Sequence, residues 1–203
     1  MKKSVSWGNY PKYNVKIEQI DSNKFSFKKK SIPYGNGRSY GDSCINDNLI
    51  DVKSRNSILN FDKKNGSISV EGGVLVDKVI EKILPEGWFL PVVAGTKFIT
   101  IGGAIASDVH GKNHHIDGCF SNYVEWFKLL MPNGSLKKCS TEENKELFIA
   151  SCGGMGLTGV IIEAKLKLKK ISSSNIFQTT IKSKNLKETF EILNEYKNEN
   201  LKI

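Results

Sequence analysis

The chain has 203 residues, of which 39% are hydrophobic, so it can bury a core, and it contains no run of about 18 apolar residues that would predict a membrane-spanning helix. Its formal net charge of +9 comes almost entirely from lysine, because arginine occurs only at Arg38 and Arg55. Nucleic-acid-binding surfaces concentrate arginine among aromatic residues, so this charge indicates a solvated lysine surface and no nucleic-acid partner. Attraction to an anionic membrane or to a phosphorylated substrate fits the positive charge equally well.

The N-terminal sequence MKKSVSWGNYPKYN is positively charged but lacks the apolar run of a signal peptide. We therefore expect a cytoplasmic protein, with any peripheral membrane contact at the inner face of the membrane. The four cysteines, Cys44, Cys119, Cys139 and Cys152, show no C-x-x-C spacing. They are expected to be free thiols, with neither a zinc site nor a redox pair.

Short β-type segments dominate the first third of the chain. The first thirty residues are polar and poorly periodic, apart from a strand expected near Lys24–Lys28. The sequence KKNG at Lys63–Gly66 is typical of a hairpin turn. Four more strands are predicted between turns rich in Gly, Asn, Asp or Lys: Ser31–Tyr34, Leu49–Val52, Ile58–Asp62 and Ser67–Glu71.

Helical periodicity begins at Val74 and ends at Pro85 and Gly87. The apolar face of this helix consists of Val76, Val79, Ile80, Ile83 and Leu84. A strand is expected at Trp88–Val93. Beyond it, Thr100 is the predicted N-cap of a helix that runs to Ala106.

The second half of the chain begins with a hairpin and continues with a helix and a strand. The hairpin pairs Val124–Met131 with Ser135–Cys139 around the turn Pro132-Asn133-Gly134. The other predicted elements are a helix at Glu142–Ser151, a half-buried strand at Gly159–Leu168, a strand near Phe177–Ile181 and an amphipathic helix at Leu186–Lys197. This order has no regular βαβ repetition, so we predict an α+β fold.

Three glycine-bearing segments are candidates for ligand binding. The first, Gly35–Asp42, could present successive backbone amides to a pyrophosphate; an ordinary glycine-rich turn is the alternative. The second segment consists of Pro91–Thr96 and Thr100–Ala106. Because Gly102-Gly103 stands in the first turn of the predicted helix, a diphosphate could approach unpaired backbone amides there. The alternative is tight packing of this helix through its small residues. The third is Gly153–Gly159. Neither G-x-G-x-x-G nor a P-loop is present, which disfavours the usual NAD and ATP folds.

The order of these segments, with the sequence HGKNHH at His110–His115 between the second and the third, is the most specific feature of the chain. From about Trp7 to about Lys170 it resembles the FAD-binding domain of the vanillyl-alcohol-oxidase-type (PCMH-type) flavoproteins, and within that family the decaprenylphosphoryl-β-D-ribose 2′-oxidase-like oxidoreductases. The resemblance implies a domain at residues 1–170 made of two α/β lobes with FAD between them. Residues 171–203 would then be the truncated start of a substrate domain.

The resemblance also implies site residues. His110 would lie near the flavin, more as a positioning residue than as a catalytic one, and Lys112, Asn113, His114 and His115 would form a polar wall facing the substrate. A metal site made from the three histidines is disfavoured, because no carboxylate or cysteine stands at ligand spacing. The residues expected to bind FAD are Gly35, Asn36, Gly37, Arg38, Ser39, Tyr40, Gly41, Asp42, Gly95, Thr96, Thr100, Gly102, Gly103, Ser107, Asp108, His110, Val160 and Ile161.

The activity implied is oxidation of a secondary alcohol of a sugar to a ketone, with a polyprenyl-phosphate-linked or nucleotide-linked sugar as the substrate, in cell-wall or polysaccharide biosynthesis. Some relatives attach FAD covalently through a histidine in the first glycine segment; Arg38 stands at that position, so non-covalent FAD is expected. Two alternatives stay open. One is an alditol or aldonolactone oxidase, and the other is a cofactor-binding fragment without turnover, completed by a second polypeptide or a C-terminal domain.

Overall fold

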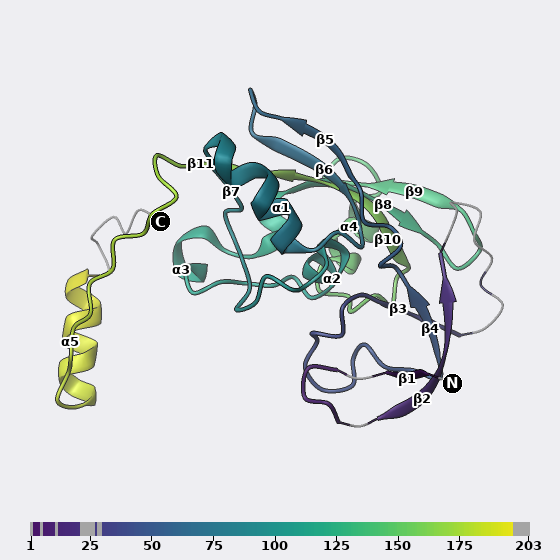
Figure 1. Ribbon diagram of the computed structural model, residues 1–203, viewed down its shortest axis with the longest axis horizontal. Coiled ribbons are helices and arrows are strands. Elements are labelled where there is room, and N and C mark those ends of the chain that lie inside the picture. The colour runs from purple at the N-terminus through teal and green to yellow at the C-terminus, as the bar shows by residue number, and fades with distance from the viewer. Residues whose placement is uncertain (1, 5, 11, 21–26, 28–29, 197–203) are drawn as a thin grey trace. The chain divides into compact units, whose positions relative to one another are not determined.

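The computed structural model describes residues 2–4, 6–10, 12–20, 27 and 30–196. The chain divides into two compact units, Met1–Ile171 and Ser172–Ile203. The first unit contains a five-stranded sheet, a four-stranded sheet, a two-stranded pair and several short helices (Figure 1). In the second unit the described part holds the helix α5 (Leu186–Tyr196), so the amphipathic helix predicted near the end of the chain is confirmed.

The larger sheet is antiparallel, with the strand order β5-β6-β10-β8-β9. The predicted hairpin turns are confirmed at Gly66 and Gly134, where φ is +67° and +81°. Along the central strand, the alternating apolar residues at Val160, Ile162, Ala164 and Leu166 are buried, as the pattern predicts. The strands are β5 (Ile58–Asp62), β6 (Ser67–Glu71), β8 (Val124–Leu130), β9 (Leu136–Cys139) and β10 (Val160–Lys167).

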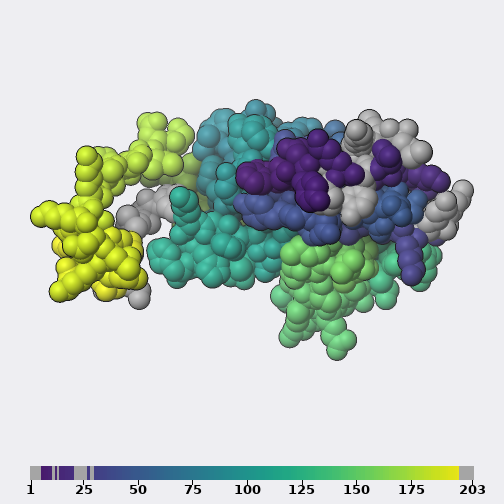
Figure 2. All heavy atoms as spheres, turned by 90° about the horizontal axis from the view of Figure 1, so that it is seen from below, coloured from purple at the N-terminus to yellow at the C-terminus, as the bar shows by residue number. Residues whose placement is uncertain are grey.

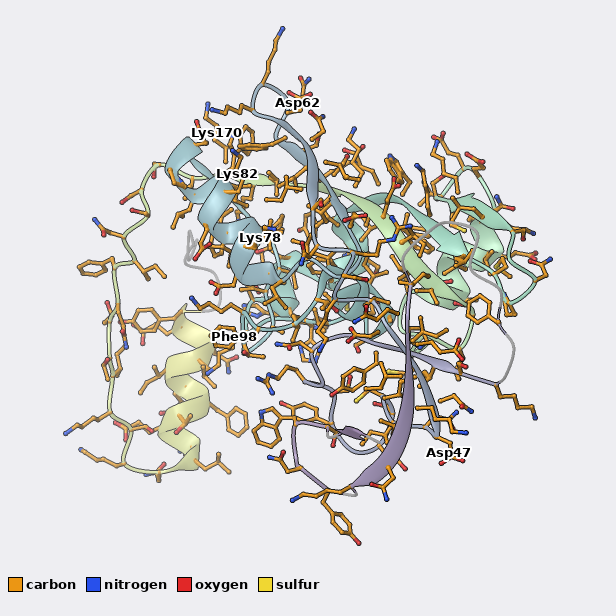
Figure 3. All side chains as sticks on the ribbon, turned by 45° about the vertical axis from the view of Figure 1, so that its right-hand side comes forward. Asp47, Asp62, Lys78, Lys82, Phe98 and Lys170 are labelled. Carbon is orange, nitrogen blue, oxygen red and sulfur yellow. The ribbon has the colours of Figure 1, made fainter. Side chains whose placement is uncertain are left out.

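Helix α1 (Val76–Ile83) follows the predicted periodicity. It buries Val76, Val79 and Ile83 in the main hydrophobic core, while Lys78 and Lys82, both labelled in Figure 3, are exposed. The helix continues into the 3-10 helix η1 (Leu84–Glu86) and stops at Gly87, where φ is +76°. Glycine adopts this left-handed conformation at little steric cost, so the predicted stop is confirmed.

The smaller sheet has the order β1-β2-β4-β3. Strand β2 (Tyr13–Gln19) lies between β1 (Lys2–Ser4), which is antiparallel to it, and β4 (Asn48–Asp51), which is parallel; β3 (Ile32–Tyr34) pairs in parallel with β4. The expectation that the first thirty residues are poorly periodic is wrong for β2, where Val15 is buried in the alternation of the strand.

A small apolar cluster joins the two sheets. Ile20, Ile50 and Val52 of the smaller lobe pack against side chains of the larger sheet, Leu130, Val160 and Ile162. The short helix α2 (Ile101–Ala106) lies between the two sheets (Figure 1). Because the lobes share buried apolar contacts, the space between them has a defined geometry. The α+β fold with two lobes is therefore confirmed.

Two predicted strands are wrong or too long. Of Trp88–Val93, only β7 (Trp88–Phe89) is a strand, paired with β11 (Lys169–Lys170). Pro91 cannot donate to a ladder, and its carbonyl accepts a hydrogen bond from the Asn113 side chain instead (2.9 Å). The segment Phe177–Ile181 is irregular, and Phe177 is 94% exposed, because no strand among the described residues pairs with it.

Two other boundaries differ from the sequence pattern. Helix α4 begins at Lys145 (Lys145–Ser151), three residues after the predicted start. The Ser140 hydroxyl accepts hydrogen bonds from the amides of Glu142 and Glu143, and this turn replaces the first helical turn. The strand expected at Lys24–Lys28 lies, apart from residue 27, outside the described residues.

Candidate functional site

A cavity of about 610 Å³ lies between the two lobes, and all three glycine-bearing segments reach it. This volume is within the range of about 300–1,000 Å³ that is usual for cofactor sites. The cavity brings together most of the residues that the sequence assigns to a cofactor: Gly35, Asn36, Gly37, Arg38, Ser39, Tyr40, Gly95, Thr96, Thr100, Gly102, Gly103, Ser107, His110, Val160 and Ile161.

The first glycine segment follows β3 and turns where Gly37 adopts a left-handed conformation (φ +62°). The side-chain amide of Asn36 donates to the Phe98 carbonyl (2.8 Å), which ties this segment to the loop before α2. Within the described chain, the backbone amides of Asn36, Gly37 and Arg38 donate no hydrogen bond. These three donors at the cavity are available for a phosphate group.

The first segment packs closely on the start of α2. A Cβ atom at Gly35 would lie 2.5 Å from Thr100 Oγ1, a distance that real Cβ atoms do not show. Thr100 is buried and is the N-cap of α2, as predicted, because its hydroxyl accepts a hydrogen bond from the Gly103 amide (3.1 Å). Gly35 is therefore needed for the contact between the two segments, whatever the cavity binds.

The prediction that α2 offers unpaired amides to a diphosphate is wrong. The Ile101 amide donates to the Val74 carbonyl (2.8 Å) and the Gly102 amide to the Gly72 carbonyl (2.7 Å), while Thr100 takes the Gly103 amide. All three N-terminal donors are therefore satisfied by the protein itself. At Gly102 the alternative interpretation holds, because a Cβ atom there would lie 3.0 Å from the Gly72 carbonyl oxygen.

The third glycine segment joins α4 to β10 and lies against the end of α2. The Gly153 amide donates to the Ile105 carbonyl (3.1 Å), and the Met155 amide donates to the Ala106 carbonyl (2.8 Å). These bonds bring Met155, Gly156 and Gly159 to the wall of the cavity, next to the predicted residues Val160 and Ile161. Figure 2 shows the surface of this segment, in green, beside the blue surface of the smaller lobe.

Three residues that the sequence assigns to the cofactor do not line the cavity: Gly41, Asp42 and Asp108. Gly41 and Asp42 are exposed beyond the turn. The Asp108 carboxylate accepts a hydrogen bond from the Ser121 amide (2.9 Å) and borders a second, open cavity of about 770 Å³. Asp108 thus holds the chain after α2 to the segment at Ser121 and borders the second cavity instead of the first.

Of the sequence HGKNHH, only His110 lines the cavity. Its ring is exposed and lies edge-on to the ring of His114, with 5.2 Å between the ring centroids. Asn113 is held by the Pro91 carbonyl and by the Asp117 carboxylate (2.7 Å), and α3 (His114–Asp117) follows. The structure therefore does not bring Lys112, Asn113, His114 and His115 into the cavity, although His114 contacts His110.

Sequence reasoning missed several lining residues, and Trp7 is the most informative of them. Its amide donates to the Ser39 carbonyl (3.1 Å), and its ring meets Tyr40 edge-on at 5.6 Å. The signal available in the sequence was a tryptophan directly before a glycine, Trp7-Gly8. Cys44 also lines the cavity; it is buried, and burial raises the pKa of its thiol. All four cysteines are free thiols.

Two searches cover only the part of the chain that the structure describes. No group of three or more His, Cys, Asp or Glu side chains is placed there to hold a metal ion. None of the described helices is both long and apolar enough to cross a membrane.

Comparison with known proteins gives a family match in the region of the cavity. Residues 26–140, more than half of the chain, match a protein family described as FAD binding domain. The match includes the first two glycine-bearing segments and the sequence HGKNHH.

Curated relatives extend this match. A decaprenylphosphoryl-beta-D-ribose oxidase from Mycolicibacterium smegmatis is 40% identical over 140 residues, which are 68% of this chain and 30% of that protein. An L-gulonolactone oxidase from Mus musculus is 27% identical over 171 residues, 83% of this chain and 38% of that protein. A D-lactate dehydrogenase from Anaerostipes hadrus is 29% identical over 125 residues, 59% of this chain and 26% of that protein. The chain spans less than two fifths of the length of these relatives.

Proposed function

The chain belongs to the PCMH-type family of FAD-binding oxidoreductase domains, and from this premise we propose that it binds FAD non-covalently in the cavity between its two lobes. The observation that carries the proposal is the convergence of the three glycine-bearing segments on one cavity of suitable volume. Bound FAD would supply the two-electron acceptor for the oxidation of a substrate.

The residues of the cavity fit this cofactor in two respects. The open amides of Asn36, Gly37 and Arg38 suit the pyrophosphate, and Arg38 adds an exposed guanidinium that can pair with a phosphate oxygen. Apolar wall residues such as Val160 and Ile161 suit the flat ring systems. Arg38 stands where some relatives carry an attachment histidine, and a guanidinium does not form that covalent bond.

We propose a secondary alcohol of a sugar, on a polyprenyl-phosphate carrier, as the substrate class. The support is the 40% identity to a decaprenylphosphoryl-beta-D-ribose oxidase, which is higher than the 27% identity to an L-gulonolactone oxidase. A lipid-linked substrate would also suit a lysine-rich surface at the inner face of a membrane. The gulonolactone oxidase match covers more of this chain, so a lactone oxidase is the second candidate.

His110 is the residue of this chain that we assign to the substrate side. It is an exposed imidazole on the cavity wall, and it can orient a hydroxyl group or accept its proton. One such residue does not enclose a substrate. We therefore propose that the second unit, Ser172–Ile203, belongs to a substrate domain. In its described part the apolar side chains Leu186, Phe190 and Leu193 of α5 are exposed. The 203-residue chain should then bind FAD with little or no sugar oxidation.

The cofactor proposal is tested by the visible absorption spectrum of the purified chain before and after addition of FAD, followed by acid precipitation. We expect a flavin spectrum that stays with the protein on gel filtration, and a yellow supernatant after acid treatment. Colour that stays in the pellet would contradict non-covalent binding. No retained flavin at any FAD concentration, from a protein that is folded by circular dichroism, would contradict the cofactor itself.

A further inference from the structure

Met155 has an unusual backbone conformation for its residue type. Four non-glycine residues of the described chain have positive φ: Asn9, Asp108, Asn144 and Met155, the last with φ +52°. Asparagine and aspartate tolerate the left-handed region, because their short polar side chains can hydrogen-bond locally. Methionine has no such compensation. Its backbone at position 155 is therefore strained.

The protein's own packing does not explain why a side chain is kept at this position. Met155 is 45% exposed and belongs to none of the hydrophobic clusters of the described residues. The hydrogen bond from its amide to the Ala106 carbonyl would form equally well with glycine, which also has an amide. Glycines already stand at positions 153, 154 and 156. Glycine at 155 would thus relieve the strain and keep the hydrogen bond to Ala106.

Met155 does, however, line the cavity between the lobes. A thioether packs favourably against an aromatic ring. Resting on the proposed function, we propose that Met155 binds one of the two ring systems of FAD, and that this contact is the reason for a methionine in a left-handed conformation. Strained backbone conformations of non-glycine residues cluster at ligand sites, so the strain at Met155 points to a role of its side chain there.

The proposal predicts that folding and binding respond in opposite directions. In the flavin-free 203-residue chain, Met155→Gly should raise Tm by about 2 °C, because the strain is relieved. The same variant should weaken FAD binding about fivefold, as measured by quenching of flavin fluorescence. Met155→Ala keeps the Cβ atom and therefore the strain, so it should lose a similar amount of affinity with no gain in Tm.

Leu157→Ala is the matched control. Leu157 lies two residues further along the same segment, is 81% exposed and does not line the cavity, so FAD affinity should stay within twofold of wild type. Titrations with FMN and with ADP identify the ring: a loss for FMN assigns the contact to the isoalloxazine, and a loss for ADP assigns it to the adenine.

Other outcomes overturn the proposal. If Met155→Gly binds FAD as tightly as wild type, the side chain makes no contact with the cofactor. If Tm and affinity fall together in both Met155 variants, Met155 is a packing residue. If the wild-type chain binds no FAD, both the proposed function and this inference fail. If the wild-type chain binds FAD tightly and both Met155 variants keep its FAD affinity, this inference alone is refuted.

Discussion

At the scale of single residues, the glycines of the cavity differ in what surrounds them. Cβ atoms added at Gly35 and Gly102 would meet the protein's own atoms at 2.5 Å and 3.0 Å. At Gly95, which also lines the cavity, a Cβ atom would have no neighbour within 4 Å. Gly95 is therefore the position where a side chain can occupy the ligand's space without disturbing the fold.

We predict that Gly95→Val weakens FAD binding at least about tenfold while the free energy of unfolding changes by less than about 0.5 kcal/mol. Gly103→Val should lower both quantities, because a Cβ atom there lies 2.9 Å from the Thr100 hydroxyl that caps α2. Flavin fluorescence titration gives the affinity and urea unfolding gives the stability. A Gly95→Val protein with wild-type affinity would place the cofactor away from this part of the wall.

At the scale of elements, an ion pair holds the loop after β4 against β6. Arg55 Nη1 lies 2.9 Å from Glu71 Oε1, and both side chains are largely buried. Burial alone would raise the pKa of Glu71, but the hydrogen bond from the Ser57 amide and the Arg55 guanidinium outweigh it and lower the pKa below its usual value. The carboxylate therefore adds stability that is fully present above the unfolded-state pKa and is lost as the pH falls through the lower folded-state pKa.

Glu71→Gln should accordingly lower the free energy of unfolding at pH 7 by about 2 kcal/mol, because Arg55 loses a charged hydrogen-bond partner. The difference between wild type and variant should shrink as the pH falls below the ordinary pKa of glutamate, because the Glu71 carboxylate of the unfolded chain then takes up a proton before that of the folded chain. Urea unfolding at a series of pH values measures it. Glu81→Gln, at an exposed position on α1, is the control and should show no such trend. A difference that stays constant from pH 7 to pH 3 would rule out the ion pair as its cause.

Elements with a strong local pattern were predictable from the sequence, and those that depend on distant partners were not. Both β5 and β6, joined by a glycine turn, have the predicted bounds, and Thr100 caps α2. The end of β7 was missed because it depends on a hydrogen bond between Pro91 and Asn113, 22 positions away. The cavity follows the same rule: the order of its glycine segments is visible in the sequence, whereas the pairing of the α2 amides with Gly72 and Val74 is visible only in three dimensions.

At the scale of the whole molecule, the end of the first unit is defined by contacts of its last residues. Strand β11 pairs with β7, the Leu168 amide donates to the Gly66 carbonyl (2.8 Å), and the Ile171 amide donates to the Gly87 carbonyl (3.0 Å). Lys169 Nζ lies 3.4 Å from the Asp117 carboxylate, which also binds Asn113 and so holds the segment that follows His110. These contacts assign residues 168–171 to the FAD-binding unit.

A chain that ends at Ile171 should therefore keep the Tm of the 203-residue chain within about 2 °C and its FAD affinity within twofold, since every contact named above is retained. A chain that ends at Lys167 loses β11, the two backbone hydrogen bonds and the ion pair to Asp117. Its Tm should fall by at least about 4 °C, and FAD should bind more weakly because the segment around His110 loses an anchor. Differential scanning calorimetry and flavin titration on the two truncated chains measure both effects. If the chain ending at Ile171 aggregates or loses FAD, residues 172–203 are part of the FAD-binding unit and their assignment to a substrate domain is wrong.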